Sequence, residues 1–157
     1  MKILLLVIGK TDEKYLMEGM DKYRNRLKHY IGFDCEEIPD IKNRKSLSEA
    51  QQKKLEGDLI LAKLKVGDKL VLLDDKGKEF TSLAFSKHLQ LQMNSGIKRL
   101  VFVVGGPYGF DTSVYAKAQG KLSLSKMTFS HQMIRLFMVE QIYRAMTIQK
   151  NEPYHHE

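Results

Sequence analysis

The sequence predicts an α/β protein with a mostly parallel, open sheet of about five strands and helices on both faces. Apolar runs such as Ile3 to Ile8 and Leu100 to Val104 show no polar alternation. Continuous apolar strands of this kind are typical of a parallel sheet that is covered on both sides. With 157 residues, 43% of them hydrophobic, the chain has the size of one domain spanning residues 1–157.

The first predicted unit is a strand followed by a helix. Lys2 to Ile8 is the strand, and its apolar run is too short for a membrane span or the core of a signal peptide. The helix follows from residues that recur at three- and four-residue spacing, namely Leu16, Met20, Tyr23, Leu27 and Tyr30. We therefore expect no membrane association for this segment.

A strand, a helix and another strand come next. Cys35 to Ile38 is the second predicted strand. Ser46-Leu-Ser-Glu49 has the pattern of a capping box and predicts a helix that continues to about Leu64. Lys69 to Asp74 is the third strand, and Asp75-Lys-Gly-Lys78 predicts a turn after it.

The second half repeats the alternation. Ser82 is the expected cap of a helix to about Met93, and Arg99 to Val104 is the fourth strand. Lys121 to Leu124 is the fifth strand, and the last helix is expected from Ser130 to about Gln149. Apolar residues are spread around this last helix and suggest two covered sides: Phe137, Met138, Ile142, Met146 and Ile148.

A glycine-rich loop follows the fourth strand. Gly105 and Gly106 place no Cβ at the strand end, so backbone groups can approach a flat ligand, and Gly106 tolerates the restriction that Pro107 imposes. Loops that follow neighbouring parallel strands meet at one sheet edge, where open α/β sheets bind ligands. Gly-Gly-Pro is also common in ordinary turns. The loop lacks the glycine fingerprints of dinucleotide and nucleoside triphosphate sites.

The charge distribution favours an anionic partner. The formal net charge is +7; residues 1–80 hold 17 Lys and Arg against 15 Asp and Glu, and residues 81–157 hold 9 against 4. Nucleic acid fits best, because clustered cations neutralise phosphates. An acidic membrane is the weaker alternative, and a solvated surface would carry the same charge. The single cysteine, Cys35, lies in a predicted strand, which favours a packing role and a cytosolic protein.

Four segments of the second half resemble a known family. They are Gly105-Gly-Pro-Tyr-Gly109, Leu124-Ser-Lys-Met-Thr-Phe-Ser-His-Gln-Met133, Glu140-Gln-Ile-Tyr-Arg-Ala145 and Pro153-Tyr-His155. In these segments, in their order and from the opening Met1-Lys-Ile-Leu onward, the chain resembles the 23S rRNA pseudouridine N3-methyltransferases of the SPOUT class. The resemblance implies S-adenosylmethionine as cofactor, a homodimer, and a C-terminal trefoil knot from about Gly105 onward. General folding rules would not propose a knot.

The resemblance also assigns the cofactor site. Matched position by position, the family's cofactor contacts fall on Leu73, Gly105, Leu124, Ser125, Lys126, Met127, Thr128 and Phe129. These residues lie at the ends of three predicted strands, which agrees with the expected ligand edge. Each also has an ordinary structural explanation, because a strand leucine is usually core and Ser or Thr is common in turns.

The acceptor chemistry points to the C-terminal tail. N3 of a pseudouridine is an imide nitrogen that must lose its proton, so a base or a stabilising cation is needed nearby. The candidate bases are His131, His155 and His156, and the candidate cations are Arg135 and Arg144.

In the family a Tyr-His tail, here Tyr154 and His155, completes the site and meets the substrate. With Arg144 as the electrostatic partner, these are the predicted catalytic residues. His156 replaces the Arg or Lys that is usual there. Arg144 lies one turn after Glu140, so a surface ion pair is its alternative role, and the four terminal residues, Tyr154 to Glu157, are expected to bury little surface. No metal site is expected.

The predicted function is therefore methyl transfer from S-adenosylmethionine to N3 of a pseudouridine in 23S rRNA of the assembled ribosome. Two alternatives stay open: a non-catalytic RNA-binding or ribosome-associated factor, and a methyltransferase that acts on another RNA such as tRNA. The cofactor segments do not identify the target base.

Overall fold

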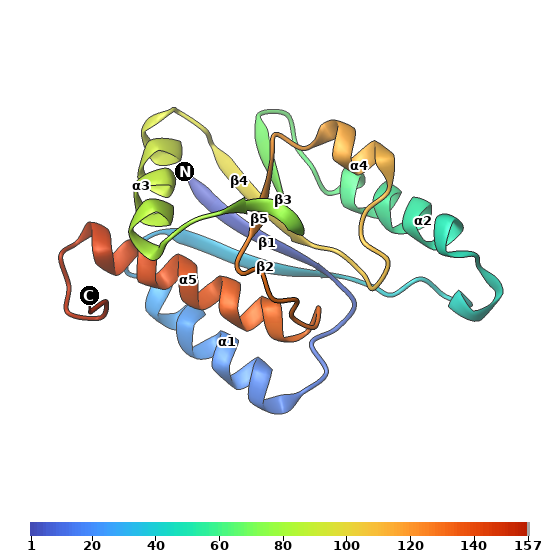
Figure 1. The fold of residues 1–157 in the computed structure, drawn as a ribbon, viewed down its shortest axis with the longest axis horizontal. Coiled ribbons are helices and arrows are strands. Elements are labelled where there is room, and N and C mark those ends of the chain that lie inside the picture. The colour runs from blue at the N-terminus through green and yellow to red at the C-terminus, as the bar shows by residue number, and fades with distance from the viewer. Residues whose placement is uncertain (157) are drawn as a thin grey trace.

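All strands of the molecule run parallel in one five-stranded sheet of order β2-β1-β4-β3-β5. The computed structural model describes residues 1–156. Every strand is followed by a helical crossover or a loop on one of the two faces, as a parallel sheet requires. The predicted fold class, an open parallel sheet with helices on both faces, is confirmed (Figure 1).

The elements have the following bounds. The strands are β1 (Lys2–Ile8), β2 (Gly32–Ile38), β3 (Asp68–Glu79), β4 (Arg99–Val104) and β5 (Gly120–Ser123). The helices are α1 (Lys14–Leu27), the short 3₁₀ helix η1 (Arg44–Ser46), α2 (Glu49–Ala62), α3 (Ser82–Asn94), α4 (Thr112–Lys117) and α5 (Met133–Gln149).

Each face of the sheet has its own apolar core. Helices α1, α3 and α5 cover one face, and α2 and α4 cover the other (Figure 1). In β1, Leu5 contributes to the first core and Leu4 and Leu6 to the second, because successive strand side chains point to opposite faces. Continuous apolar strands are thus explained by burial on both sides.

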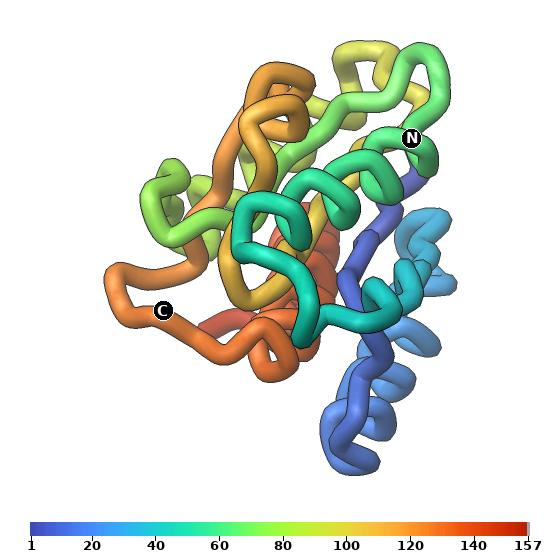
Figure 2. The backbone as a smooth tube through the Cα atoms, turned by 90° about the vertical axis from the view of Figure 1, so that its right-hand side faces the viewer, coloured from blue at the N-terminus to red at the C-terminus, as the bar shows by residue number. Residues whose placement is uncertain are grey.

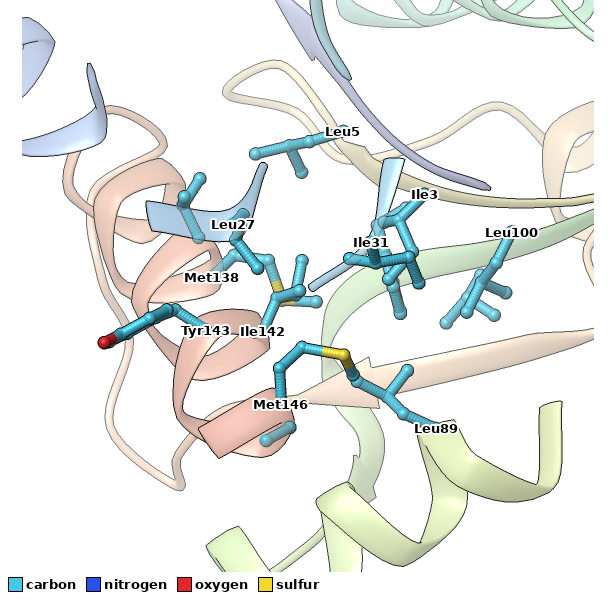
Figure 3. Close-up of a cluster of buried hydrophobic side chains, with 14 of the residues drawn as sticks. Ile3, Leu5, Leu27, Ile31, Leu89, Leu100, Met138, Ile142, Tyr143 and Met146 are labelled. Carbon is cyan, nitrogen blue, oxygen red and sulfur yellow. The ribbon is translucent and has the colours of Figure 1, made fainter. Parts of the chain in front are cut away.

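Helix α5 packs on the sheet with α1 on one side and α3 on the other, and this position accounts for its apolar surface. Met138, Ile142 and Met146 are buried within the chain, where they pack with Leu27 of α1 and Leu89 of α3 (Figure 3). The apolar sides of this helix are therefore covered mostly by other elements of the same chain. Phe137, by contrast, is 38% exposed.

Several predicted boundaries are wrong by one turn or less. The cap of α2 is Ser48 and not the predicted Ser46. The Ser48 side chain accepts from Gln51 N, and the Gln51 side chain accepts from Ser48 N. Ser46 is instead the last residue of η1, where its hydroxyl donates to Asn43 O. Thr81, not Ser82, caps α3. Both errors arise because neighbouring Ser and Thr residues have the same capping chemistry.

Other differences involve whole segments. Strand β2 begins at Gly32 and not at Cys35, β5 ends at Ser123, and α1 ends at Leu27, before Tyr30. Helix α5 begins at Met133, since the residues from Ser130 onward form a turn. The short helix α4 was not predicted, because six residues are too few for a clear periodic pattern.

The predicted turn at Asp75 to Lys78 is wrong in an informative way. Strand β3 continues to Glu79, but both Leu73 and Lys78 pair with Leu122 of β5, so the intervening residues form a wide irregularity. Gly77 lies in this segment against the β5 backbone: a Cβ there would lie 2.5 Å from the carbonyl carbon of Leu122. Only glycine permits this approach.

Gly77→Ala is therefore expected to destabilise the fold. Its methyl group would overlap backbone atoms, which cannot move aside as a flexible side chain can, and overpacking of this kind costs about 1 to 3 kcal/mol or more. Chemical denaturation should show a lower midpoint. Gly120→Ala in β5 is the matched control, since its Cβ would meet only Val71 at 3.8 Å and the midpoint should stay within experimental error. Equal midpoints for the two variants would contradict this account of Gly77.

Candidate functional site

A cavity of about 330 Å³ lies at the carboxyl edge of the sheet. The ends of β3, β4 and β5 form its floor, and the residues that precede α5 form one wall. Figure 2 shows the loop after β4 and the segment after β5 side by side at this edge. The position is the one at which open α/β sheets bind ligands, and the volume is within the range of small-molecule sites.

The glycine loop after β4 has a different constraint at each glycine. A Cβ on Gly105 would lie 3.1 Å from the ring of Phe110, and one on Gly106 would lie 2.6 Å from Oε2 of Glu56. Gly109 has φ +78° and donates its N–H to Gly106 O at 3.2 Å, which closes a turn. The loop therefore presents backbone to the cavity because its neighbours leave no room for side chains.

The carboxyl group behind the loop is unusual. Glu56 of α2 is only 3% exposed, and its carboxyl group accepts a hydrogen bond from Gln52 Nε2 at 2.9 Å. Burial raises the pKa of this carboxyl group. Its contact with Gly106 makes Glu56 a support of the loop, which the sequence pattern did not indicate.

The segment after β5 folds back on itself through short polar contacts. Ser123 Oγ donates to Ser125 O at 2.8 Å, and Ser125 Oγ accepts from Met127 N at 2.9 Å. Met127 is 77% exposed at the rim of the cavity, and the Phe129 ring lies 4.9 Å from that of Phe137. Serine side chains thus stabilise an irregular backbone that lines the cavity.

Nearly all predicted cofactor residues line this one cavity. They are Leu73, Gly105, Leu124, Ser125, Met127, Thr128 and Phe129; Lys126 is not among the lining residues. The structure therefore brings together residues from three strand ends that are distant in sequence. Their role in binding a cofactor stays a prediction.

Two acidic residues at the cavity were missed. Asp74 and Asp75 line it, but sequence analysis assigned them to a strand end and a turn. The Asp74 carboxylate accepts from Tyr115 Oη at 2.5 Å and from Lys76 N at 2.9 Å. Burial acts to raise the pKa of Asp74, but these hydrogen bonds outweigh it and the pKa is lowered. Asp74 is therefore an anion at neutral pH, suited to a ligand with a cationic group.

Arg135, a predicted cation for the substrate, has another role. Its side chain is completely buried at the start of α5. It donates to Ile8 O at 2.6 Å, Gly9 O at 3.0 Å, Thr11 Oγ1 at 3.0 Å and His131 O at 2.9 Å. The guanidinium thus joins the end of β1 to the wall of the cavity and cannot reach a substrate. This correction reflects burial, which one sequence does not show.

The predicted catalytic residues form a separate cluster. Arg144 donates to Glu140 Oε1 through Nη2 at 2.6 Å, and its guanidinium carbon lies 4.7 Å from the centre of the Tyr154 ring. Arg144 Nη1 lies 3.3 Å from Nδ1 of His155. The ion-pair alternative for Arg144 is thus present, and the same guanidinium also contacts both tail residues.

The tail is packed and not loose. Tyr154 Oη donates to Glu140 Oε1 at 2.9 Å and shares a hydrogen bond with Tyr23 Oη at 3.1 Å, and its ring makes an edge contact with Tyr143, with the ring centres 4.8 Å apart. Glu152 accepts from Tyr30, which adds a second connection, to the turn that follows α1. The expectation that the four terminal residues bury little surface is wrong for Tyr154, because two aromatic rings and a carboxylate hold this tyrosine; His156 is exposed, and Glu157 lies outside the described residues.

The environment of Tyr154 also determines the protonation state of its phenol. Burial raises the pKa of this phenol, and the hydrogen bonds to Tyr23 and Glu140 raise it further. At neutral pH the phenol therefore keeps its proton, which it donates in a hydrogen bond. Tyr154 does not act as a base in this arrangement.

The cavity and the tail lie at opposite ends of α5. Ile134 lines the cavity, and Arg144 lies ten positions later, about 15 Å along the helix axis at 1.5 Å per residue. Figure 1 shows the tail beside the end of α1, away from the loops that form the cavity. One chain therefore does not bring the predicted cofactor residues and the predicted catalytic residues together.

The remaining candidate side chains lie at the cavity, in the tail and in β2. His131 lines the cavity and is exposed, whereas His156 is exposed in the tail. Burial raises the pKa of the half-buried Cys35 to about 11, consistent with a packing role. In residues 1–156, no group of three or more His, Cys, Asp or Glu side chains could hold a metal, and no helix could cross a membrane.

Comparisons with known proteins agree with this architecture. A family model described as a predicted SPOUT methyltransferase matches residues 1–155. The chain is 68% identical to a Parabacteroides distasonis protein named ribosomal RNA large subunit methyltransferase H, over 100% of both chains. Proteins with the same name from Flavobacterium johnsoniae and Bacteroides thetaiotaomicron are 62% and 57% identical, again over 100% of both chains.

Proposed function

Because the chain belongs to the SPOUT methyltransferase family, we propose that it methylates large-subunit ribosomal RNA with S-adenosylmethionine as methyl donor. The family resemblance noted from the sequence is confirmed. The observation that carries the proposal is the convergence of seven family-matched residues on one cavity. The relatives named above supply the RNA class, since their names specify ribosomal RNA of the large subunit.

The cavity fits the proposed cofactor. Backbone groups of the glycine loop suit a flat purine, Leu124 and Phe129 supply apolar walls, and Asp74 offers an anion for an amino group or sulfonium. When bound, the cofactor supplies an electrophilic methyl group on a positively charged sulfur. The chain's part in this step is alignment, which needs a rigid pocket more than an acid or base at the sulfur.

The acceptor is proposed to be N3 of a pseudouridine in a 23S rRNA stem-loop of the assembled ribosome. An imide must lose its proton before it attacks, and the guanidinium of Arg144 can stabilise the ring anion that results. His155, whose Nδ1 lies 3.3 Å from Arg144 Nη1, is the proposed proton acceptor, and Tyr154, whose ring packs against the Arg144 guanidinium, positions that cation. A non-catalytic RNA-binding factor needs no such cluster, so its presence supports the catalytic proposal.

A homodimer is proposed to complete the site. The cavity and the tail cluster occupy opposite ends of α5, so a twofold axis that sets two α5 helices antiparallel would place each tail near the partner's cavity. Tyr15, Met127, Phe129 and Phe137 expose apolar surface at the cavity end of α1 and α5 and would form part of the contact. The same proposal includes a trefoil knot within each chain, as the family implies. It also includes a cytosolic location.

The target is tested by mass analysis of ribosomal RNA from cells with and without this protein. We expect the loss of one methyl group from a single pseudouridine of 23S rRNA. Purified protein and S-adenosylmethionine should restore that methyl group on ribosomes from the deletion strain. A methyl group lost from tRNA instead would support the alternative substrate, and unchanged RNA together with no cofactor binding would support the non-catalytic alternative.

A further inference from the structure

The second half of helix α1 and the turn that follows it carry a run of positive charge next to the tail cluster. Residues 22–29 contain four cations, Lys22, Arg24, Arg26 and Lys28, together with His29, and no carboxylate. Of the four, only Arg24 forms an ion pair within residues 1–156, with Asp21 at 3.2 Å. The charge of the other three is therefore available to a partner.

This segment is joined directly to the residues assigned to chemistry. Tyr23 of α1 bonds to Tyr154 of the tail, and Tyr30, just beyond the helix, bonds to Glu152. The Arg26 guanidinium carbon lies 5.5 Å from the centre of the Tyr143 ring, which itself packs against Tyr154. The end of α1 that carries these cations therefore lies beside the tail (Figure 1).

The rim of the cavity has the opposite charge. Asp74 and Asp75 line it, and the lowered pKa of Asp74 keeps that carboxylate ionised at neutral pH. A phosphate backbone would be repelled there. An RNA that presents one base to the chemistry must therefore place its backbone elsewhere, on a surface with unpaired cations.

We propose that the exposed cations in and just after the second half of α1, chiefly Lys22 and Lys28, bind the phosphate backbone of the RNA that flanks the target base. The inference rests on the proposed function and deepens it, since it assigns the surface that holds the substrate. Lysines bind phosphates as point charges without base preference, so this contact fixes position and not sequence. Stacking on the target base and recognition of its edges are assigned to the tail.

A different explanation must be separated from this one. Cations in the last turns of a helix stabilise it through the helix dipole, by about 0.3 to 1 kcal/mol each. That role predicts a loss of stability when the charges are removed and no change in the salt dependence of RNA binding. The phosphate role predicts the reverse, because each neutralised phosphate contributes about 0.7 to 0.9 to the slope of log affinity against log salt.

The experiment compares two variants with the same loss of charge. Lys22→Gln/Lys28→Gln removes the α1 cations, and Lys87→Gln/Lys117→Gln removes two exposed lysines of α3 and α4 that form no ion pair within residues 1–156. Methyl transfer to ribosomes from the deletion strain is measured over a series of KCl concentrations at constant Mg²⁺. The KM for ribosomes, the kcat, the affinity for S-adenosylmethionine and the mass in solution are determined for each protein.

We expect the α1 variant to raise KM and to reduce the salt slope by about 1 to 2, with kcat and cofactor affinity at the parental values. The control variant should keep the parental slope. The proposal is overturned if both variants change the slope equally, if the α1 variant changes only stability, or if it alters the mass in solution, which would make this surface a subunit contact. A parent protein that transfers no methyl group to ribosomes would instead overturn the proposed function itself.

Discussion

Gly105→Val is expected to lower the affinity for S-adenosylmethionine about a hundredfold, because an overpacking cost of about 3 kcal/mol in the complex corresponds to that factor. The new side chain begins 3.1 Å from the Phe110 ring, which also lines the cavity. The branched side chain and the ring cannot both keep their positions and leave room for a ligand. Calorimetric titration of the parent and the variant measures the change.

The packing of Phe110 means that Gly105→Val should affect stability as well as binding. Phe110 is only 7% exposed and belongs to the core beneath α2 and α4, so valine should also cost some stability. Gly105→Ala is the graded control: a single carbon at 3.1 Å requires a shift of a few tenths of an ångström and should weaken binding much less. A folded valine variant with the parental affinity would remove Gly105 from the cofactor site.

The fold was largely predictable because its strongest signals are local. Strands β1 and β4 are apolar throughout, and their predicted bounds, Lys2 to Ile8 and Arg99 to Val104, match the structure. The pairing order, the wide irregularity around Gly77 and the position of α5 between α1 and α3 were not predictable. They depend on contacts between segments that are distant in sequence, such as Gly77 with Leu122.

The candidate site was likewise predictable only in part. Backbone-rich loops at strand ends indicated the cavity edge, and the resemblance selected the residues that line it. Burial was not visible in the sequence, so Arg135 was taken for a substrate contact and Glu56 was overlooked. Both are buried ionisable groups that support the two cavity loops, one through hydrogen bonds to the end of β1 and to His131 and the other through contact with Gly106.

Packing of the tail changes how its chemistry must be tested. Removal of residues from Tyr154 onward would delete two hydrogen bonds, each worth about 0.5 to 1.5 kcal/mol, and an edge-to-face ring contact of similar value. Truncation should therefore lower the melting temperature as well as the rate. A loss of activity in the truncated protein would not separate chemistry from stability, so single substitutions that leave Tyr154 in place are needed.

His155→Ala is expected to lower kcat about 10² to 10⁴-fold, the usual contribution of a proton acceptor, while cofactor affinity stays at the parental value. Arg144→Gln should have a comparable effect through poorer stabilisation of the ring anion. Single-turnover methylation of ribosomes gives the rate, and calorimetry gives the affinity. Glu152→Gln is the control, because it changes a tail carboxylate that contacts Tyr30 and none of the proposed catalytic groups.

Mixed subunits provide the sharpest form of this experiment. Chains with Gly105→Val lack a working cavity, and chains with His155→Ala lack a working tail, so each protein alone is inactive. If a tail completes the partner's cavity, a mixed dimer contains one intact site, and an equal mixture of chains should regain about a quarter of the parental activity. If each site lies within one chain, no mixture regains activity. Light scattering that finds a fully active monomer would contradict the composite site directly, since the 15 Å or so between cavity and tail along α5 leaves one chain unable to join them.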